Sequence, residues 1–125
     1  MQRESQPVLI SSLVLFEFRQ SLRLQAFRFS KDRTQGFSKM KANRMLEALQ
    51  ANIVGGLLLI PPLEDWAKVH SLAEGLSLQY TIQGGYRSFD VLHVATAIHL
   101  KAGRFITFDK HQAGLAKAAN LYVQP

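Results

Sequence analysis

The stretch of sequence that decides the fold runs from Arg87 to Asp109 and reads Arg-Ser-Phe-Asp-Val-Leu-His-Val-Ala-Thr-Ala-Ile-His-Leu-Lys-Ala-Gly-Arg-Phe-Ile-Thr-Phe-Asp. Its first part is typical of an apolar helix that starts near Ser88, and its last part is typical of a short apolar strand. Asp90 therefore falls at a helix start and Asp109 at a strand end. In an α/β protein both places face a shared crevice at one edge of the sheet. Two carboxylates at such an edge point to a metal site.

Outward from this stretch, apolar runs bounded by turn residues alternate between strand and helix patterns. The predicted strands are Pro7–Ser11, Leu57–Ile60, Arg104–Phe108 and Leu121–Val123. The predicted helices are Leu13–Phe29, Ser38–Ile53, one that opens at Glu64–Asp65, one from Ser88 to about Lys101, and Lys110–Ala119. Ser88 is expected to cap its helix and Gly103 to end it, with a turn at Gly84–Gly85. The alternation predicts an α/β fold with a mostly parallel sheet in a single domain, residues 1–125.

Composition narrows the class of partner. The formal net charge is +6, from 15 Lys and Arg against 9 Asp and Glu, and a small basic domain is a candidate for binding nucleic acid or another acidic partner. The sequence contains no Cys, which excludes disulfides and thiolate metal sites and is compatible with the cytoplasm. Its longest apolar runs are far too short to span a bilayer, so no membrane association is expected.

Three acids lie within apolar sequence, where an ionised carboxylate is costly unless something pairs with it: Glu17, Asp90 and Asp109. Each has a purely structural explanation. Asp90 would stabilise the first turn of its helix, Asp109 would cap the helix after it, and Glu17 would form a surface ion pair. Taken together they favour binding of Mg²⁺ or Mn²⁺, which prefer carboxylate oxygens, and thus metal-assisted phosphodiester cleavage.

Three further residues are assigned to substrate or to supporting contacts. Arg87 stands nearest the acids among the basic residues and would grip a phosphate. Thr107 would share a strand face with Asp109 and hold a metal-bound water, although an ordinary strand threonine explains it equally well. His93 follows Asp90 by one helical turn, and a hydrogen-bonded core histidine is the favoured interpretation. His111 is expected at the surface.

The sequence resembles PIN domains, and among them the VapC-type ribonuclease toxins of bacterial toxin–antitoxin pairs. Three segments carry the resemblance in order: Ile10–Phe18, Arg87–Ala97 and Phe105–Asp109. The resemblance implies a three-layer α/β/α fold and RNA cleavage that depends on Mg²⁺ or Mn²⁺. It also implies homodimers and inhibition by a cognate antitoxin protein. Glu17, Asp90 and Asp109 match acids of the family's metal site, and Thr107 matches a small polar residue often found beside them.

The resemblance also implies a departure from the family. A PIN domain begins with a strand ending in Asp, followed by a first helix, whereas this sequence begins with the family's second strand. The expectation is therefore an N-terminally truncated fold without that strand, helix and Asp. Three explanations are a start assigned too late, a truncated gene, and a second chain that completes the sheet in an oligomer.

Two functions remain after this reasoning. The first is a PIN-type, metal-dependent endoribonuclease that uses Glu17, Asp90 and Asp109 as metal ligands and catalytic groups. The second is a non-catalytic PIN-like module that binds an antitoxin or RNA. A basic α/β domain whose acids are only helix caps is a weaker third interpretation.

Overall fold

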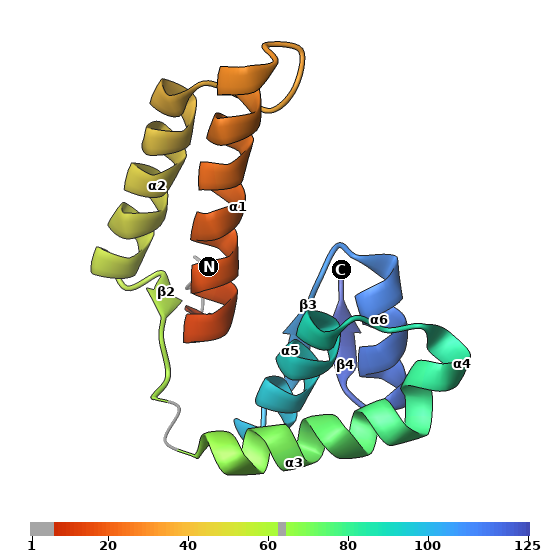
Figure 1. The fold of residues 1–125 in the computed structure, drawn as a ribbon. Coiled ribbons are helices and arrows are strands. Elements are labelled where there is room, and N and C mark those ends of the chain that lie inside the picture. Colours follow the sequence, from red (N-terminus) through yellow and green to blue (C-terminus); the bar gives the residue numbers. More distant parts are fainter. Residues whose placement is uncertain (1–6, 63–64) are drawn as a thin grey trace. The chain divides into compact units, whose positions relative to one another are not determined.

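The computed structural model describes residues 7–62 and 65–125, and Figure 1 shows its ribbon. The chain is a mixed α/β protein, mostly helical, with small parallel sheets of two strands. It divides into two compact units, Met1–Leu63 and Glu64–Pro125. The mixed α/β class expected from the sequence is confirmed. The single domain over residues 1–125 remains a prediction, because it depends on how the two units associate.

The described part of the N-terminal unit consists of β1 (Val8–Leu9), α1 (Ser12–Lys31), α2 (Lys39–Val54) and β2 (Leu58–Leu59). The strands β1 and β2 pair in parallel, with Val8 beside Leu58. The amide of Val8 donates a hydrogen bond to the carbonyl oxygen of Leu57 at 3.0 Å. A helical hairpin therefore links two parallel neighbours, which need a long crossover because a tight turn cannot join them.

In this unit α1 and α2 lie side by side, as Figure 1 shows. Each begins at a serine whose hydroxyl accepts a backbone hydrogen bond. Ser11 accepts from the amide of Val14 at 3.1 Å, and Ser38 from that of Lys41 at 3.2 Å. Such a cap contributes about 1 kcal/mol. Four apolar side chains are buried on the two helices: Leu15, Leu22, Ala42 and Leu49. Since burying one leucine contributes about 1.5–3 kcal/mol, helix packing stabilises the unit more than its short strands do.

The C-terminal unit is built around α5, which packs against both α3 and α6. Its elements are α3 (Trp66–Leu76), a π-helical turn η1 (Ser77–Thr81), α4 (Ile82–Gly84), α5 (Ser88–His99), β3 (Arg104–Ile106), α6 (Lys110–Ala118) and β4 (Tyr122–Gln124). The strands β3 and β4 pair in parallel, with Arg104 beside Tyr122. The core side chains of the unit are Val69, Leu76, Val91, Val94, Ala95, Leu115 and Ala116.

The third predicted helix begins where expected. Asp65 is its N-cap, and the carboxylate accepts a hydrogen bond from the amide of Lys68 at 3.1 Å. Glu64, the other predicted opening residue, lies outside the described residues. Past Leu76 the chain stays helical through η1 and α4, and it turns only at Gly85, where φ is +67°. The predicted turn at Gly84–Gly85 is thus confirmed.

The predicted helix from Ser88 to about Lys101 is found as α5, but both of its predicted caps are wrong. Arg87 is the N-cap, without a side-chain cap bond, and Ser88 is the first helical residue. The helix ends at His99, and Lys101 takes the left-handed conformation (φ +54°) expected of Gly103. The amides of Lys101 and Ala102 then bond to the carbonyls of Ile98 and Ala97, both at 3.0 Å. This is the Schellman pattern, which satisfies the last carbonyls and places the left-handed residue two positions before the glycine.

The pairing direction expected from the sequence is confirmed in both units. Each unit contains one two-stranded parallel sheet, formed by β1 with β2 and by β3 with β4. The strands β1, β2 and β3 are two or three residues long, shorter than the four- and five-residue runs predicted. The strand β4 has the predicted length of three residues, shifted by one position. None of the described helices is long and apolar enough to cross a membrane.

Gly36 in the connection between α1 and α2 should be intolerant of substitution. Its φ is +64°, and a Cβ there would overlap the backbone carbonyl oxygen of Gln25. We expect Gly36→Ala to lower the free energy of unfolding by at least about 2 kcal/mol, because left-handed strain adds to a main-chain clash. The control is Gly75→Ala in α3, where a Cβ meets nothing within 4 Å. That change should raise stability by about 0.5–1 kcal/mol. Urea denaturation followed by circular dichroism measures the free energy of unfolding of both variants. A stabilising Gly36→Ala would mean that a Cβ at this position does not clash with the carbonyl oxygen of Gln25.

Candidate functional site

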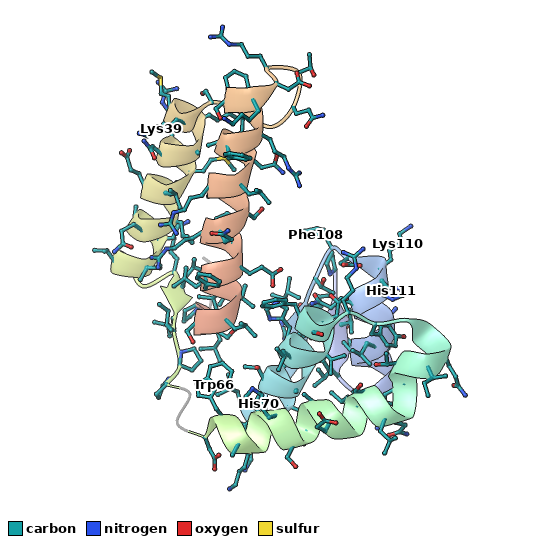
Figure 2. All side chains as sticks on the ribbon, viewed as in Figure 1. Lys39, Trp66, His70, Phe108, Lys110 and His111 are labelled. Atoms are coloured by element: carbon teal, nitrogen blue, oxygen red, sulfur yellow. The ribbon has the colours of Figure 1, made fainter. Side chains whose placement is uncertain are left out.

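Two of the predicted acids are brought together at the N-terminal ends of α5 and α6 in the C-terminal unit. Asp90 lies in the first turn of α5, partly buried, and Asp109 lies at the N-cap of α6, exposed. The sequence places them 19 residues apart with a helix and a strand between them. Figure 2 shows Phe108, Lys110 and His111 around the start of α6.

Asp109 caps α6, as predicted. Its Oδ1 accepts hydrogen bonds from the amides of His111 at 2.8 Å and Gln112 at 3.3 Å. The Oγ1 of Thr107 accepts from the amide of Asp109 at 3.1 Å, which fixes the two-residue connection from β3. Both cap bonds use Oδ1, so Oδ2 of Asp109 has no hydrogen bond to another described residue. The cap thus orients the carboxylate and leaves one of its oxygens available to a ligand.

Gln112 connects the two carboxylates. Its backbone N–H donates to Oδ1 of Asp109, and its side-chain Nε2 donates to Oδ1 of Asp90 at 3.5 Å. One residue on the first turn of α6 therefore contacts both acids, which brings the start of α5 next to the start of α6. The sequence reasoning missed Gln112. The available clue was its spacing, because a Gln three residues after an N-cap is the position of a capping box.

A second contact holds the same two helix ends together. The ring of Tyr86 lies 4.7 Å from that of His111, centroid to centroid, and His111 Nε2 lies 3.3 Å from the carbonyl oxygen of Gly85. The Tyr86 ring also covers Gly84, where a Cβ would overlap it. His111 is exposed, as predicted, yet it ties the segment before α5 to the first turn of α6. No sequence spacing indicates this contact, because it joins segments 25 residues apart.

The residues assigned to substrate or supporting contacts, Arg87, Thr107 and His93, lie close to the two acids in the chain. Arg87 is exposed at the N-cap of α5, and its carbonyl accepts the first helical bond, from Val91 at 3.1 Å. Thr107 supports Asp109 as described, and its amide donates to the Gln124 carbonyl at 2.9 Å, which extends the pairing of β3 with β4. His93 is 7% exposed, with the Phe89 ring 6.2 Å from its own.

Glu17 lies in the other unit, on α1, with an exposed side chain. The prediction that Glu17 joins Asp90 and Asp109 in one site remains a prediction. Among the described residues of either unit alone, no three His, Cys, Asp or Glu side chains gather as metal ligands. The C-terminal unit thus supplies two of the three predicted carboxylates.

Comparisons of the chain with protein-family models, with curated proteins and with solved structures gave no match.

Asp109 is expected to show a separable structural role. Asp109→Ala removes the acceptor for two backbone amides and should lower the free energy of unfolding by about 1 kcal/mol. Asp109→Asn keeps an acceptor oxygen and should cost only a few tenths of a kcal/mol, because Asn caps about as well as Asp. Thermal unfolding of both variants measures the difference. Equal destabilisation by the two substitutions would mean that the negative charge, and not the hydrogen bonding, stabilises α6.

Proposed function

We propose that this protein is a PIN-type, metal-dependent endoribonuclease, the toxin of a toxin–antitoxin pair, which hydrolyses RNA phosphodiester bonds. One observation carries the proposal: Asp90 and Asp109, from separate elements, converge on Gln112 at the edge where β3 delivers the chain to α6. Carboxylates that are held close together repel each other, and a cation between them relieves that repulsion. The proposal includes the three-layer α/β/α arrangement, since both units pair their strands in parallel with helices as connections.

The residues fit Mg²⁺ or Mn²⁺. Mg²⁺ is usually bound through one or two carboxylates, keeps several waters and takes its remaining ligands from substrate phosphates. Asp90 and Asp109 supply two carboxylates, one of which has an oxygen outside the cap, and Glu17 is proposed as the third. When bound, such an ion would lower the pKa of a coordinated water and neutralise charge on the phosphate.

The chain's own residues have proposed roles around this centre. Gln112 sets the orientation of both carboxylates, and the Tyr86–His111 contact keeps the two helix starts in place. Arg87 would hold a phosphate oxygen, because a guanidinium offers paired donors to oxyanions. Thr107 would orient a water beside Asp109. His93, buried behind Asp90 on α5, would support the site from the core side.

The partners that go with this proposal are RNA as substrate, a cognate antitoxin protein as inhibitor, and a second copy of the chain in a homodimer, in the cytoplasm. An oligomer in which another chain completes the sheet remains part of the proposal. The second candidate function is a non-catalytic PIN-like module that binds an antitoxin or RNA. The presence of only two of the three acids in the C-terminal unit is the observation that favours it.

Asp90→Asn should reduce Mn²⁺-dependent cleavage of RNA by at least about 100-fold, because it removes a metal ligand and keeps the shape of the side chain. Asp109→Asn should have the same effect at nearly unchanged stability. Cleavage is measured by gel electrophoresis of a labelled RNA with Mn²⁺ and with EDTA.

The matched control is Asp65→Asn, which changes the N-cap acid of α3 in the same unit. It should cleave RNA as the unchanged protein does. Cleavage that survives Asp90→Asn, or falls equally in Asp65→Asn, would remove the assigned site. Binding of RNA without any cleavage would favour the non-catalytic module.

A further inference from the structure

The hairpin of α1 and α2 carries most of the positive charge of the protein. Between residues 19 and 44 there are eight Lys and Arg against a single acid, Asp32. These eight residues, called here the basic hairpin surface, are Arg19, Arg23, Arg28, Lys31, Arg33, Lys39, Lys41 and Arg44. All but the partly exposed Arg19 are exposed. This density of positive charge exceeds that of an average solvent-exposed face. The cations repel one another, and this unfavourable energy needs an explanation.

The described part of the chain does not neutralise this charge. None of the eight side chains forms an ion pair with a described carboxylate, and the ion pair that the structure shows, Lys68 with Asp65 at 4.0 Å, lies in the other unit. The carboxylate of Asp32 is already hydrogen-bonded within the connection between α1 and α2. Its Oδ1 accepts from the hydroxyl of Thr34 at 2.7 Å and from the Thr34 amide at 3.0 Å. These two bonds, the hydroxyl first, hold the pKa of Asp32 below its usual value.

Two of the lysines oppose the stability of their own helix. Lys39 and Lys41 occupy the first turn of α2, which has no acid, although the positive end of a helix dipole favours negative side chains there. Ser38 is the N-cap and Lys41 stands three residues later, where a Glu would complete a capping box. A cation at that position is unfavourable for the helix, which points to a ligand outside the unit.

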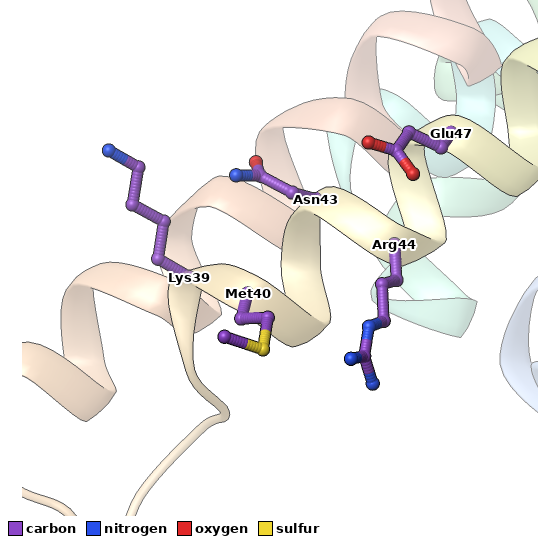
Figure 3. Close-up of a pocket in the computed structure, with 5 residues that line it drawn as sticks. All are labelled: Lys39, Met40, Asn43, Arg44 and Glu47. Carbon is purple, nitrogen blue, oxygen red and sulfur yellow. The ribbon is translucent and has the colours of Figure 1, made fainter.

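The surface also carries aromatic rings among its cations. Lys31 lies over the ring of Phe27, and Lys41 over that of Phe37, each at 5.6 Å from the centroid. Phe27 is 57% exposed. Figure 3 shows one face of α2, where five side chains line a shallow, open hollow of about 490 Å³: Lys39, Met40, Asn43, Arg44 and Glu47. Cations beside aromatic rings suit a nucleic acid, because phosphates meet the cations and unpaired bases stack on an exposed ring such as that of Phe27.

We propose that the basic hairpin surface binds the sugar–phosphate backbone of single-stranded RNA and thereby holds the substrate of the C-terminal unit. The inference rests on the proposed function for the identity of the ligand. RNA fits better than an acidic protein, because a protein interface concentrates its contacts in a central apolar cluster from which charged residues are depleted. Here the cations are spread along both helices, which suits a polymer with one charge per nucleotide and binding driven by release of counterions.

The experiment compares two double variants of equal charge in the full chain. Lys39→Glu/Lys41→Glu and Lys68→Glu/Lys117→Glu each lower the formal net charge by four, from +6 to +2. Lys68 is the matched position, since it also stands three residues after an N-cap, Asp65. Binding of a fluorescein-labelled single-stranded RNA of about 20 nucleotides is measured by anisotropy in EDTA at several KCl concentrations. EDTA makes the measurement independent of metal and of cleavage.

We expect Lys39→Glu/Lys41→Glu to weaken binding at least about tenfold at moderate salt and to reduce the slope of log Kd against log salt by about 1 to 2. The same variant should keep or raise the melting temperature, because acids suit the first turn of α2. The control pair should bind within about twofold of the unchanged protein. If Lys39→Glu/Lys41→Glu fails to fold, Lys39→Gln/Lys41→Gln replaces it, with Lys68→Gln/Lys117→Gln as control.

Equal losses in the two variants, no loss in either, or no RNA binding by the unchanged protein would overturn the inference. So would displacement of the RNA by polyglutamate at equal charge concentration, which would assign the surface to an acidic protein segment. A failure of the proposed function would give a different set of results. In that case Asp90→Asn leaves cleavage unchanged while the anisotropy difference between the two lysine pairs persists.

Discussion

The arrangement of the candidate site depends on the hydrogen bonds that the carboxylate of Asp109 accepts at the start of α6. They satisfy two amides that have no partner within the helix, and the negative charge complements the helix dipole. Because Gln112 supplies one of these amides and also reaches Asp90, the cap fixes where a second carboxylate lies. One interaction therefore starts a helix, ends the connection from β3 and sets the geometry of the acidic pair.

This double use explains why the structural and the chemical interpretations of Asp109 are compatible. A cap needs one acceptor oxygen, and the described bonds use Oδ1. The other oxygen stays open to a ligand, so stability and metal binding do not compete for the same atom. His111 also makes two separate contacts. Its backbone amide donates to Asp109, and its ring packs against Tyr86.

The two carboxylates of the proposed site and the basic hairpin surface lie in different units. The C-terminal unit presents carboxylates, which repel phosphates unless a cation lies between them. The N-terminal unit presents eight cations without carboxylate partners among the described residues. A nuclease needs both features, since the acids serve the reaction and the cations provide the affinity for the polymer. Such a division agrees with the proposed function and with the further inference drawn from it.

Local sequence patterns predicted the elements well where side chains act on their own backbone. Asp109 caps its helix as its type and position indicated, and Asp65 and Ser38 stand at the predicted helix starts. The prediction failed at the ends of α5, where Lys101 rather than Gly103 takes the left-handed turn. Propensity favours glycine at such a position, but the hydrogen bonds that close the helix select the residue that follows its last packed turn.

By itself, the sequence determined the α/β class, the order of the elements, the excess of positive charge and two carboxylates at helix starts, because each of these follows from local spacing and composition. Tertiary structure alone decided that Gln112 joins Asp90 to Asp109 and that Tyr86 packs against His111. Those contacts join segments 22 to 25 residues apart. They depend on the packing of α5 against α6, which no local pattern of residues encodes.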